Sequence, residues 1–276
     1  MKPILFVFIF ILIFDVGTLQ AQKLEKVWET TTDLKTPESV IYDYKQDIIY
    51  VSNVNENPAE KDGNGFISIL DGNGNIKNLK WVTNLNAPKG MAIYEGKLYV
   101  SDIDQLVEID IAKGEIIKKY SAPNAVFLND VSACKNGMIF VSDTRTAKIH
   151  VLENGKFKVW MEGKPFENPN GLMAEKGKLF VGDNNIYEID IATKNVKMII
   201  ADAGGVDGLE KNNDGDFVFS NWVGRIFIHK NGKNIKLYDT TAEKLNTADL
   251  DFDLKHNLIL VPTFYGNQIV AFKIVD

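Results

Sequence analysis

Cysteine is almost absent from this sequence, with Cys134 as its single example. One thiol cannot form an internal disulfide, so oxidation contributes nothing to the stability of the fold. Histidine is also scarce, with 3 residues in the whole chain. None of them lies beside Cys134 in the sequence, which argues against a catalytic thiol. We therefore expect Cys134 to be structural.

Positive charge is in deficit. The chain has 31 Lys and Arg against 37 Asp and Glu, which gives a formal net charge of -6. An acidic surface repels phosphate backbones and anionic headgroups. The composition therefore argues against nucleic acid or a membrane surface as a partner, and we expect a monomer that acts on a small molecule.

An apolar run near the N-terminus has the features of an export signal. Lys2 precedes the run, which covers 4–14, and 19–21 offers a cleavage site of small residues. The run is shorter than the roughly 20 residues that a membrane span requires. We predict a secretory signal peptide over 1–21 and a mature domain over 22–276, which places the protein in the periplasm or outside the cell. The alternative is an uncleaved N-terminal anchor, which is disfavoured because Asp15 and Gly17 interrupt the run.

Helical periodicity is missing from the mature chain, and a repeat takes its place. Each repeat has a polar residue, a short apolar strand, a turn and a second apolar strand that ends in a small polar residue. We call the polar residue the anchor, and it recurs about every 40 residues. The six anchors are Glu38, Lys89, Asn129, Asn170, Asp207 and Asp249. A period of this length with several strands per unit predicts a propeller of six blades.

The remaining strands complete the blades. Alternating runs such as 105–111 and 148–152 predict third strands, and fourth, outer strands are expected at 115–120, 156–161, 196–200 and 234–238. The last unit lacks a fourth strand, and 24–30 would supply it. This closure leaves no open sheet edge between the chain ends. The predicted fold is an all-β, six-bladed β-propeller of four-stranded antiparallel blades, closed by the N-terminal strand in the last blade.

The first strand of each propeller blade lines the central axis, so we expect the six anchors to form one ring. Oxygen donors that converge in a narrow channel suit Ca²⁺, which takes 6–8 oxygen ligands. The ring contains no His or Cys, which disfavours zinc and copper. The alternative is that the anchors only cap the strand starts and hydrate the channel.

Four segments around the anchors resemble a known family. Pro37-Glu38-Ser39, Leu128-Asn129-Asp130, Pro169-Asn170-Gly171-Leu172 and Val206-Asp207-Gly208-Leu209 are similar to the four metal-binding stations of the senescence marker protein/gluconolactonase family. The resemblance spans the mature chain. It implies a six-bladed propeller in which Glu38, Asn129, Asn170 and Asp207 hold one divalent cation, most simply Ca²⁺. It also implies hydrolysis of lactones or related esters, with Asp207 as both ligand and base.

Two positions depart from the family pattern. Phe127 stands two residues before Asn129, where sugar-lactone members usually have an Arg that can bind hydroxyl groups. Lys89 places a cation in the ring, where it could pair with Asp249 or Asp130 or bind a carboxylate of the ligand. We therefore expect Lys89, Phe127 and Asn129 to contact a substrate that is apolar or anionic rather than a sugar lactone. Asp130 is a second candidate base, and its alternative role is a hydrogen bond at a strand start.

Loops between second and third strands should form the rim of the site, through Asp104, Arg145, Asn184, Trp222, Phe264 and Tyr265. The long loop 53–65 is either a solvated excursion or a lid over the site. We expect the three histidines, His150, His229 and His256, to be structural, and the series Asp102, Asp143 and Asp183 to form a repeated hydrogen bond between blades.

The fold alone does not decide between functions. The leading hypothesis is a metal-dependent hydrolase of lactone or ester bonds. The alternative is a non-catalytic propeller that binds a ligand or protein, with a structural metal in its channel. Chemistry of the strictosidine synthase type is disfavoured, because that relative lacks the four metal stations.

Overall fold

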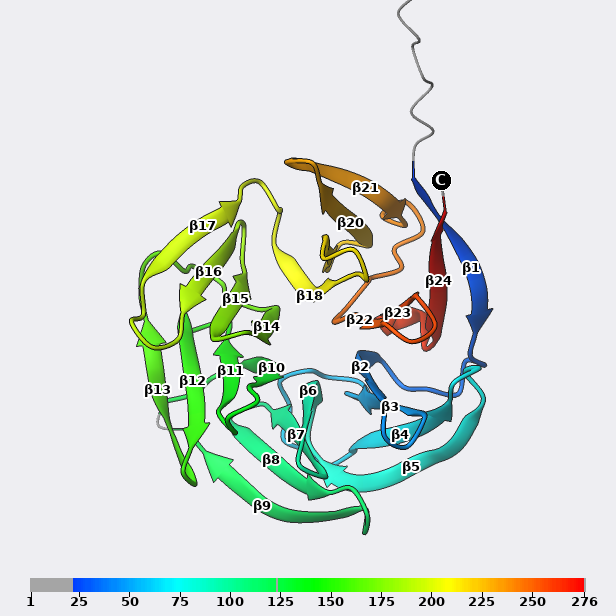
Figure 1. Ribbon diagram of the computed structural model, residues 1–276. Coiled ribbons are helices and arrows are strands. Elements are labelled where there is room, and N and C mark those ends of the chain that lie inside the picture. The colour runs from blue at the N-terminus through cyan, green and yellow to red at the C-terminus, as the bar shows by residue number, and fades with distance from the viewer. Residues whose placement is uncertain (1–21, 123, 276) are drawn as a thin grey trace, which may run out of the picture.

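The computed structural model describes residues 22–122 and 124–275, which form a ring of six sheets around a central axis (Figure 1). Each sheet has four strands, and every pairing of neighbouring strands is antiparallel. The predicted six-bladed β-propeller is therefore confirmed. The predicted signal peptide, 1–21, lies outside the described residues. Within the part of the chain that the structure describes, no helix has the length and apolar character to cross a membrane.

We number the blades in chain order and give the strands of each from the axis outward. Blade 1 contains β2 (Pro37–Asp43), β3 (Ile48–Asn53), β4 (Gly65–Asp71) and β5 (Ile76–Leu85). Blade 2 contains β6 (Pro88–Tyr94), β7 (Lys97–Asp102), β8 (Gln105–Asp110) and β9 (Glu115–Ser121). Blade 3 contains β10 (Leu128–Ala133), β11 (Ile139–Asp143), β12 (Lys148–Glu153) and β13 (Lys156–Glu162).

The second half of the ring follows the same order. Blade 4 contains β14 (Leu172–Glu175), β15 (Lys178–Gly182), β16 (Ile186–Asp190) and β17 (Val196–Ile200). Blade 5 contains β18 (Val206–Lys211), β19 (Phe217–Asn221), β20 (Arg225–Lys230) and β21 (Lys233–Asp239). Blade 6 contains β22 (Asp251–Asp253), β23 (Leu258–Pro262), β24 (Ile269–Val275) and β1 (Lys23–Glu29), with the 3-10 turn η1 (Phe264–Gly266) before β24.

The N-terminal strand closes the ring as the sequence predicts. β1 pairs with β24 from Lys23↔Val275 to Glu29↔Val270, with a bulge at Val27. Figure 1 shows β1 outside β24, next to blade 1. The Trp28 ring of β1 lies against Gly74, in the turn between β4 and β5, so this strand also connects blade 6 to blade 1.

The hydrophobic core lies between the blades. The described residues contain six large apolar clusters, and each one combines side chains from two neighbouring blades, blades 6 and 1 included. Both faces of every sheet are therefore buried. This explains why the second strands, such as β11, are continuous buried runs rather than alternating ones. Cys134 is a buried free thiol in the cluster between blades 3 and 4.

The aspartates at the ends of second strands have a different role from the predicted one. Asp143 accepts hydrogen bonds from the backbone N–H groups of Val126 (3.0 Å) and Phe127 (3.1 Å). Asp102 does the same with Asn86 and Ala87, and Asp183 with Glu167 and Asn168. The prediction of a bond between blades is wrong, because each aspartate holds the segment that enters the first strand of its own blade. Each of these segments leads directly to an anchor.

Candidate metal and substrate site

Five of the six anchors converge at one end of the channel. They line a cavity of about 210 Å³, together with side chains from the surrounding loops. The lining residues are Glu38, Pro58, Lys89, Phe127, Asn129, Asn170, Asp207, Trp222 and Phe264. All six blades or their connecting loops contribute to this cavity, which we call the anchor cavity.

The inner strands are irregular at the anchors. The pairing of first and second strand shifts register between Pro37 and Ser39, around Glu38. Equivalent shifts surround Lys89, Asn129 and Asp207. Such irregularities re-aim side chains and are frequent beside functional sites. They allow an anchor to leave the alternating pattern of its strand.

The residue after an anchor sets how closely two inner strands approach. A Cβ atom at Gly208 would lie 2.2 Å from the backbone nitrogen of Leu250 in blade 6, and one at Gly171 would lie 2.5 Å from the carbonyl oxygen of Asp207. Only glycine fits at such a distance. Gly171 therefore brings blades 4 and 5 together next to Asn170 and Asp207.

The four predicted metal ligands lie around the anchor cavity. Asn170 Nδ2 donates to Asp207 Oδ1 at 2.6 Å, and Asn129 Nδ2 donates to Thr144 Oγ1 at 3.3 Å. Two buried oxygen atoms, Glu38 Oε2 and Asn170 Oδ1, have no hydrogen-bond partner among the residues that the structure describes. Water, an ion or a ligand normally satisfies such buried oxygen atoms. The donor set of two carboxylates and two carboxamides therefore fits a hard divalent cation.

Burial dominates the electrostatics of these carboxylates. It raises the pKa of Glu38 well above its usual value, and the charges of Asp207 and Asp249 add to this effect while Lys89 opposes it. Burial also raises the pKa of Asp207 to about 7, against the hydrogen bond from Asn170. Among the described residues, no three His, Cys, Asp or Glu side chains gather as a metal cluster. At the anchor cavity, the oxygen donors for a metal are the two carboxylates together with the carboxamides of Asn129 and Asn170.

Lys89 is 1% exposed and makes no ion pair with any described residue. Its Nζ donates to the carbonyl oxygens of Ala87 and Pro58, each at 3.0 Å. Burial lowers its pKa to about 8, against the charge of Glu38, which acts on it without an ion-pair contact. The expected pairing of Lys89 with Asp249 or Asp130 is therefore not formed.

Aromatic side chains make two walls of the anchor cavity. On one side, the Phe127 ring lies 4.5 Å from Lys89 Nζ and 4.2 Å from the guanidinium carbon of Arg145. On the other, the rings of Trp222 and Phe264 are 4.7 Å apart. Tyr265 packs edge-on against Phe264, with ring centroids 4.9 Å apart. Two of the expected rim residues, Trp222 and Phe264, therefore line the cavity, and Arg145 and Tyr265 each contact an aromatic ring that lines it.

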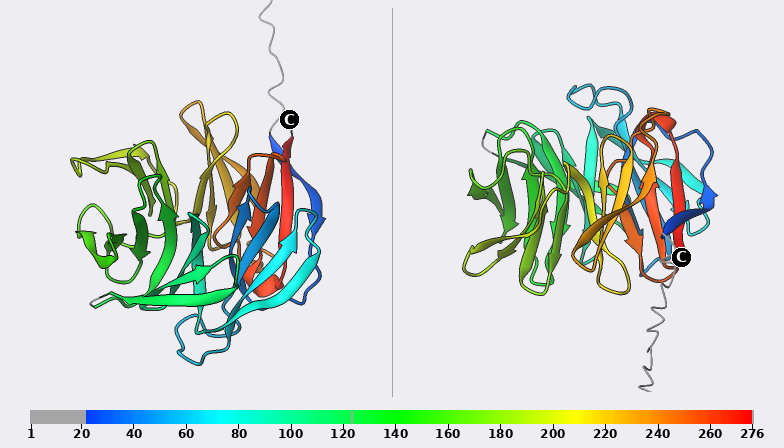
Figure 2. Two further views of the ribbon diagram at one scale, coloured as in Figure 1. Left: turned by 60° about the horizontal axis from the view of Figure 1, so that its bottom comes forward. Right: turned by 90° about the horizontal axis from the view of Figure 1, so that it is seen from above.

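The long loop between β3 and β4 folds over this end of the channel. Figure 2 shows it in light blue, extending beyond the face of the ring. Pro58 from the loop lines the cavity, and Lys61 forms an ion pair with Asp104 of blade 2 at 2.6 Å. The loop is thus a wall of the cavity rather than only a solvated excursion, and Asp104 contributes by holding it.

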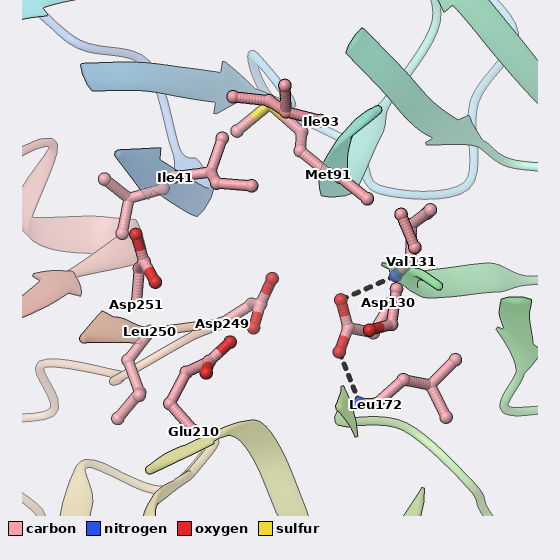
Figure 3. Close-up of a pocket in the computed structure, with 14 residues that line it drawn as sticks. Ile41, Met91, Ile93, Asp130, Val131, Leu172, Glu210, Asp249, Leu250 and Asp251 are labelled. Atoms are coloured by element: carbon pink, nitrogen blue, oxygen red, sulfur yellow. Dashed lines mark hydrogen bonds between the residues drawn. The ribbon is translucent and has the colours of Figure 1, made fainter. Parts of the chain in front are cut away.

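Asp130 and Asp249 lie in a second cavity, of about 170 Å³, farther along the channel (Figure 3). Asp130 accepts hydrogen bonds from the backbone N–H groups of Val131 and Leu172, and so joins blades 3 and 4. Asp249 accepts one from the Ser39 hydroxyl at 2.6 Å. The structure thus separates Asp249 from the ring of anchors, and it gives Asp130 the hydrogen-bonding role at a strand start.

Burial raises the pKa of every acid in this second cavity. Figure 3 shows the carboxylates of Asp130, Glu210, Asp249 and Asp251 around the channel. The pKa values of the first three lie well above their usual range, and that of Asp251 is raised to about 6. The neighbouring charges of Asp251 and Asp249 raise the pKa of Glu210 further. We call these four residues the channel acids.

Sequence reasoning missed three contributors. Pro58 gave no signal, since it lies in a loop without a counterpart in other blades. Thr144 connects two predicted ligand stations, because its hydroxyl accepts from Asn129 and donates to the carbonyl of Pro169 at 3.0 Å. Glu210 stands three residues after the anchor Asp207, and the signal for it is its place on the same first strand. None of the three histidines lines either channel cavity.

Comparisons with known proteins support the fold. No family model matches the chain, and no curated protein matches its sequence. A streptogramin B lyase structure has a TM-score of 0.68 with 14% identity, and covers 92% of this chain and 98% of its own. A catalytically inactive histidine-to-alanine variant of virginiamycin B lyase from Staphylococcus aureus, with quinupristin, has a TM-score of 0.65 with 14% identity, over 92% and 100%.

A third solved structure is also similar to this chain in its fold. The WD40 β-propeller domain of Doa1 has a TM-score of 0.62 with 15% identity, over 85% of this chain and 77% of that one. At such identities the similarity concerns the fold alone, because propellers carry many functions. The chain is therefore similar in structure to two lyases and a WD40 domain. These similarities do not indicate its activity, which depends on the residues of its own site.

Proposed function

We propose that this protein is a divalent-metal-dependent hydrolase of lactone or related ester bonds, with Ca²⁺ as its cation. One observation carries the proposal. Glu38 Oε2 and Asn170 Oδ1 are buried without a hydrogen-bond partner in the described part of the chain, at a cavity that Asn129 and Asp207 also line. A buried acceptor without a partner costs about 1–3 kcal/mol, and a cation would offset that cost. Oxygen atoms from Glu38, Asn129, Asn170 and Asp207, together with water, match the ligands that Ca²⁺ requires.

The ring residues would divide the chemistry among them. Glu38, Asn129, Asn170 and Asp207 would hold the cation, which polarises the carbonyl of the substrate and stabilises the developing negative charge. Asp207 is the better candidate base, because it lines the anchor cavity, where the substrate and the attacking water would lie. Asn170 orients this carboxylate through its 2.6 Å hydrogen bond. Asp130 is held by two backbone N–H groups in the other cavity.

The size of the anchor cavity limits the substrate. Its volume of about 210 Å³ lies below the range of roughly 300–1,000 Å³ that is typical of sites for drug-sized ligands. We therefore propose small esters or lactones as substrates. The proposal also includes action outside the cytoplasm, which follows from the predicted signal peptide.

A hydrolysis screen combined with metal titration tests this function. We expect the protein to hydrolyse at least one class among aryl esters, lactones and phosphotriesters, and to lose the activity in EDTA. Asp207→Ala removes a ligand and a charge, so Ca²⁺ affinity by calorimetry should fall at least about 10–100-fold. Asp190→Ala, at the end of β16 and outside the anchor cavity, is the control and should bind Ca²⁺ like the wild type.

Two results would count against the proposal. Equal Ca²⁺ affinity in the wild type and Asp207→Ala would contradict the metal site. Tight Ca²⁺ binding without turnover of any substrate class would favour the alternative, a ligand-binding propeller with a structural metal.

A further inference from the structure

We infer that the anchor cavity selects substrates that carry both a carboxylate and an apolar group, and that Lys89 and Arg145 bind the carboxylate. This inference rests on the proposed hydrolase and adds the class of its substrate. Four observations support it, which concern Lys89, Arg145, the charge of the ring and the opposite wall of the cavity.

The ammonium group of Lys89 has an unused donor. It carries three N–H donors, and the carbonyls of Ala87 and Pro58 accept from two of them. Within the described chain no carboxylate forms an ion pair with it, although it is 1% exposed. A buried charge without a partner is costly, and it is normally compensated by an opposite charge. A ligand carboxylate in the cavity would supply both the acceptor and the charge.

Arg145 places a second cation against the Phe127 ring, which lines the cavity. Its guanidinium carbon lies 4.2 Å from the centre of the Phe127 ring, and Lys89 Nζ lies 4.5 Å from it. Arg145 makes no ion pair with any residue in the described ranges 22–122 and 124–275, so its five N–H donors are available. A guanidinium group binds carboxylates by two parallel hydrogen bonds. The Phe127 ring thus contacts two cationic side chains, and neither of them forms an ion pair with a described residue.

The charge of the ring supports an anionic ligand. Glu38 and Asp207 are the carboxylates that line the anchor cavity, and together they would neutralise one divalent cation. Asp102 also acts on Lys89 through its charge, but neither Lys89 nor Arg145 forms an ion pair with a described residue. A neutral ligand leaves both of them unpaired, whereas a carboxylate compensates them.

The opposite wall accommodates the apolar part of such a ligand. Trp222 and Phe264 line the cavity, and Trp222 is 40% exposed, so its ring is accessible. Tyr265, which is 63% exposed, extends the same aromatic surface outward. A flat apolar group would bury its surface against these rings while the carboxylate reaches Phe127 and the two cations.

Two probes of nearly the same shape test the inference. Phenylacetate and phenylacetamide differ mainly in charge, and we would measure their affinities by calorimetry, with Ca²⁺ and in EDTA. With Ca²⁺, we expect phenylacetate to bind at least about 10-fold more tightly, as a charge-assisted hydrogen bond provides. Lys89→Met and Arg145→Gln should each reduce this preference several-fold. Lys80→Met, which removes a lysine 5.1 Å from the Phe66 ring outside the site, should leave it unchanged.

The variants separate the two cations from the metal, since a carboxylate could also bind Ca²⁺ directly. A preference for phenylacetate that persists in both Lys89→Met and Arg145→Gln would overturn the inference. So would equal affinity for the two probes, or no binding of either, in the wild type. Arg145 is exposed, so Arg145→Gln keeps the test valid even if Lys89→Met does not fold.

Failure of this inference is distinguishable from failure of the proposed function. Metal-dependent hydrolysis of neutral esters without any preference for a carboxylate would overturn the inference and leave the hydrolase. Selective phenylacetate binding that depends on Lys89 and Arg145, without hydrolysis of any ester, would do the reverse.

Discussion

The residue that follows an anchor determines how narrow the channel becomes. In blades 2, 4 and 5 this residue is glycine, and a Cβ atom there would lie 2.2–2.5 Å from an atom of the next inner strand. In blades 1 and 3 it is polar instead and bridges to a neighbour, since Ser39 donates to Asp249 and Asp130 accepts from the backbone of Leu172. Close approach or a short hydrogen bond thus joins adjacent blades beside the anchors.

A pair of glycine substitutions tests this constraint. Gly208→Ala should destabilise the protein by about 1–3 kcal/mol or more, because the added methyl group overlaps the backbone of Leu250. Gly72→Ala is the matched control, since nothing lies within 4 Å of its Cβ position. It should be neutral or stabilise by about 0.4–1 kcal/mol. Urea denaturation measures both, and equal stabilities of the two variants would contradict the close approach.

Among the strands, β1 closes the ring, because it pairs with β24 at the other end of the chain. It supplies the outer strand of blade 6 although it lies at the other end of the sequence from β22, β23 and β24. Its Trp28 packs against the cluster between blades 6 and 1, next to Gly74. Its Val27 sits in a bulge and is 52% exposed. One strand therefore offers a partly buried and an exposed side chain for comparison.

We expect Trp28→Ala to destabilise the protein far more than Val27→Ala. Truncation of a buried Trp costs about 3–5 kcal/mol, and the partial burial of Trp28 places its cost at or below the lower end of that range. An exposed substitution such as Val27→Ala usually changes stability by no more than about 0.5 kcal/mol. Urea midpoints give the difference. Similar midpoints would show that Trp28 does not contribute to closure.

The whole ring concentrates buried acids along its axis, which makes the stability of the metal-free protein depend on pH. A carboxyl group whose pKa is raised in the folded state binds its proton more tightly there than in the unfolded chain. The stability that it contributes is complete below the unfolded pKa near 4, and it is lost as pH rises through the folded value. For Asp251 and Asp207 the folded values are about 6 and about 7.

In EDTA, we therefore expect a melting temperature several degrees lower at pH 8 than at pH 5. Asp251→Asn keeps an acceptor for the backbone N–H of Tyr42 and removes one ionisable group. It should therefore reduce the difference in melting temperature between pH 5 and pH 8 by a few degrees. Asp214→Asn is the control, since the Asp214 side chain is 74% exposed. A melting temperature that rises from pH 5 to pH 8 would contradict the burial of these acids.

The sequence by itself determined the number of blades and the place of the anchors. Each repeat carries its own strand pattern, so the period of about 40 residues is visible without any long-range contact. The missing fourth strand of the last unit likewise pointed to 24–30. Because equivalent positions in a closed ring converge on its axis, the anchors could be placed together, and five of the six do line one cavity.

Only the tertiary structure decided how deep each side chain lies along that axis. Asp249 and Asp130 stand at or beside anchors in sequence, yet both line the second cavity, because register shifts and hydrogen bonds to neighbouring blades set their depth. The pairing of Lys89 with the Pro58 carbonyl depends on a loop that no other repeat has. Such contacts join residues from different blades, and local sequence patterns carry information only about residues within one blade.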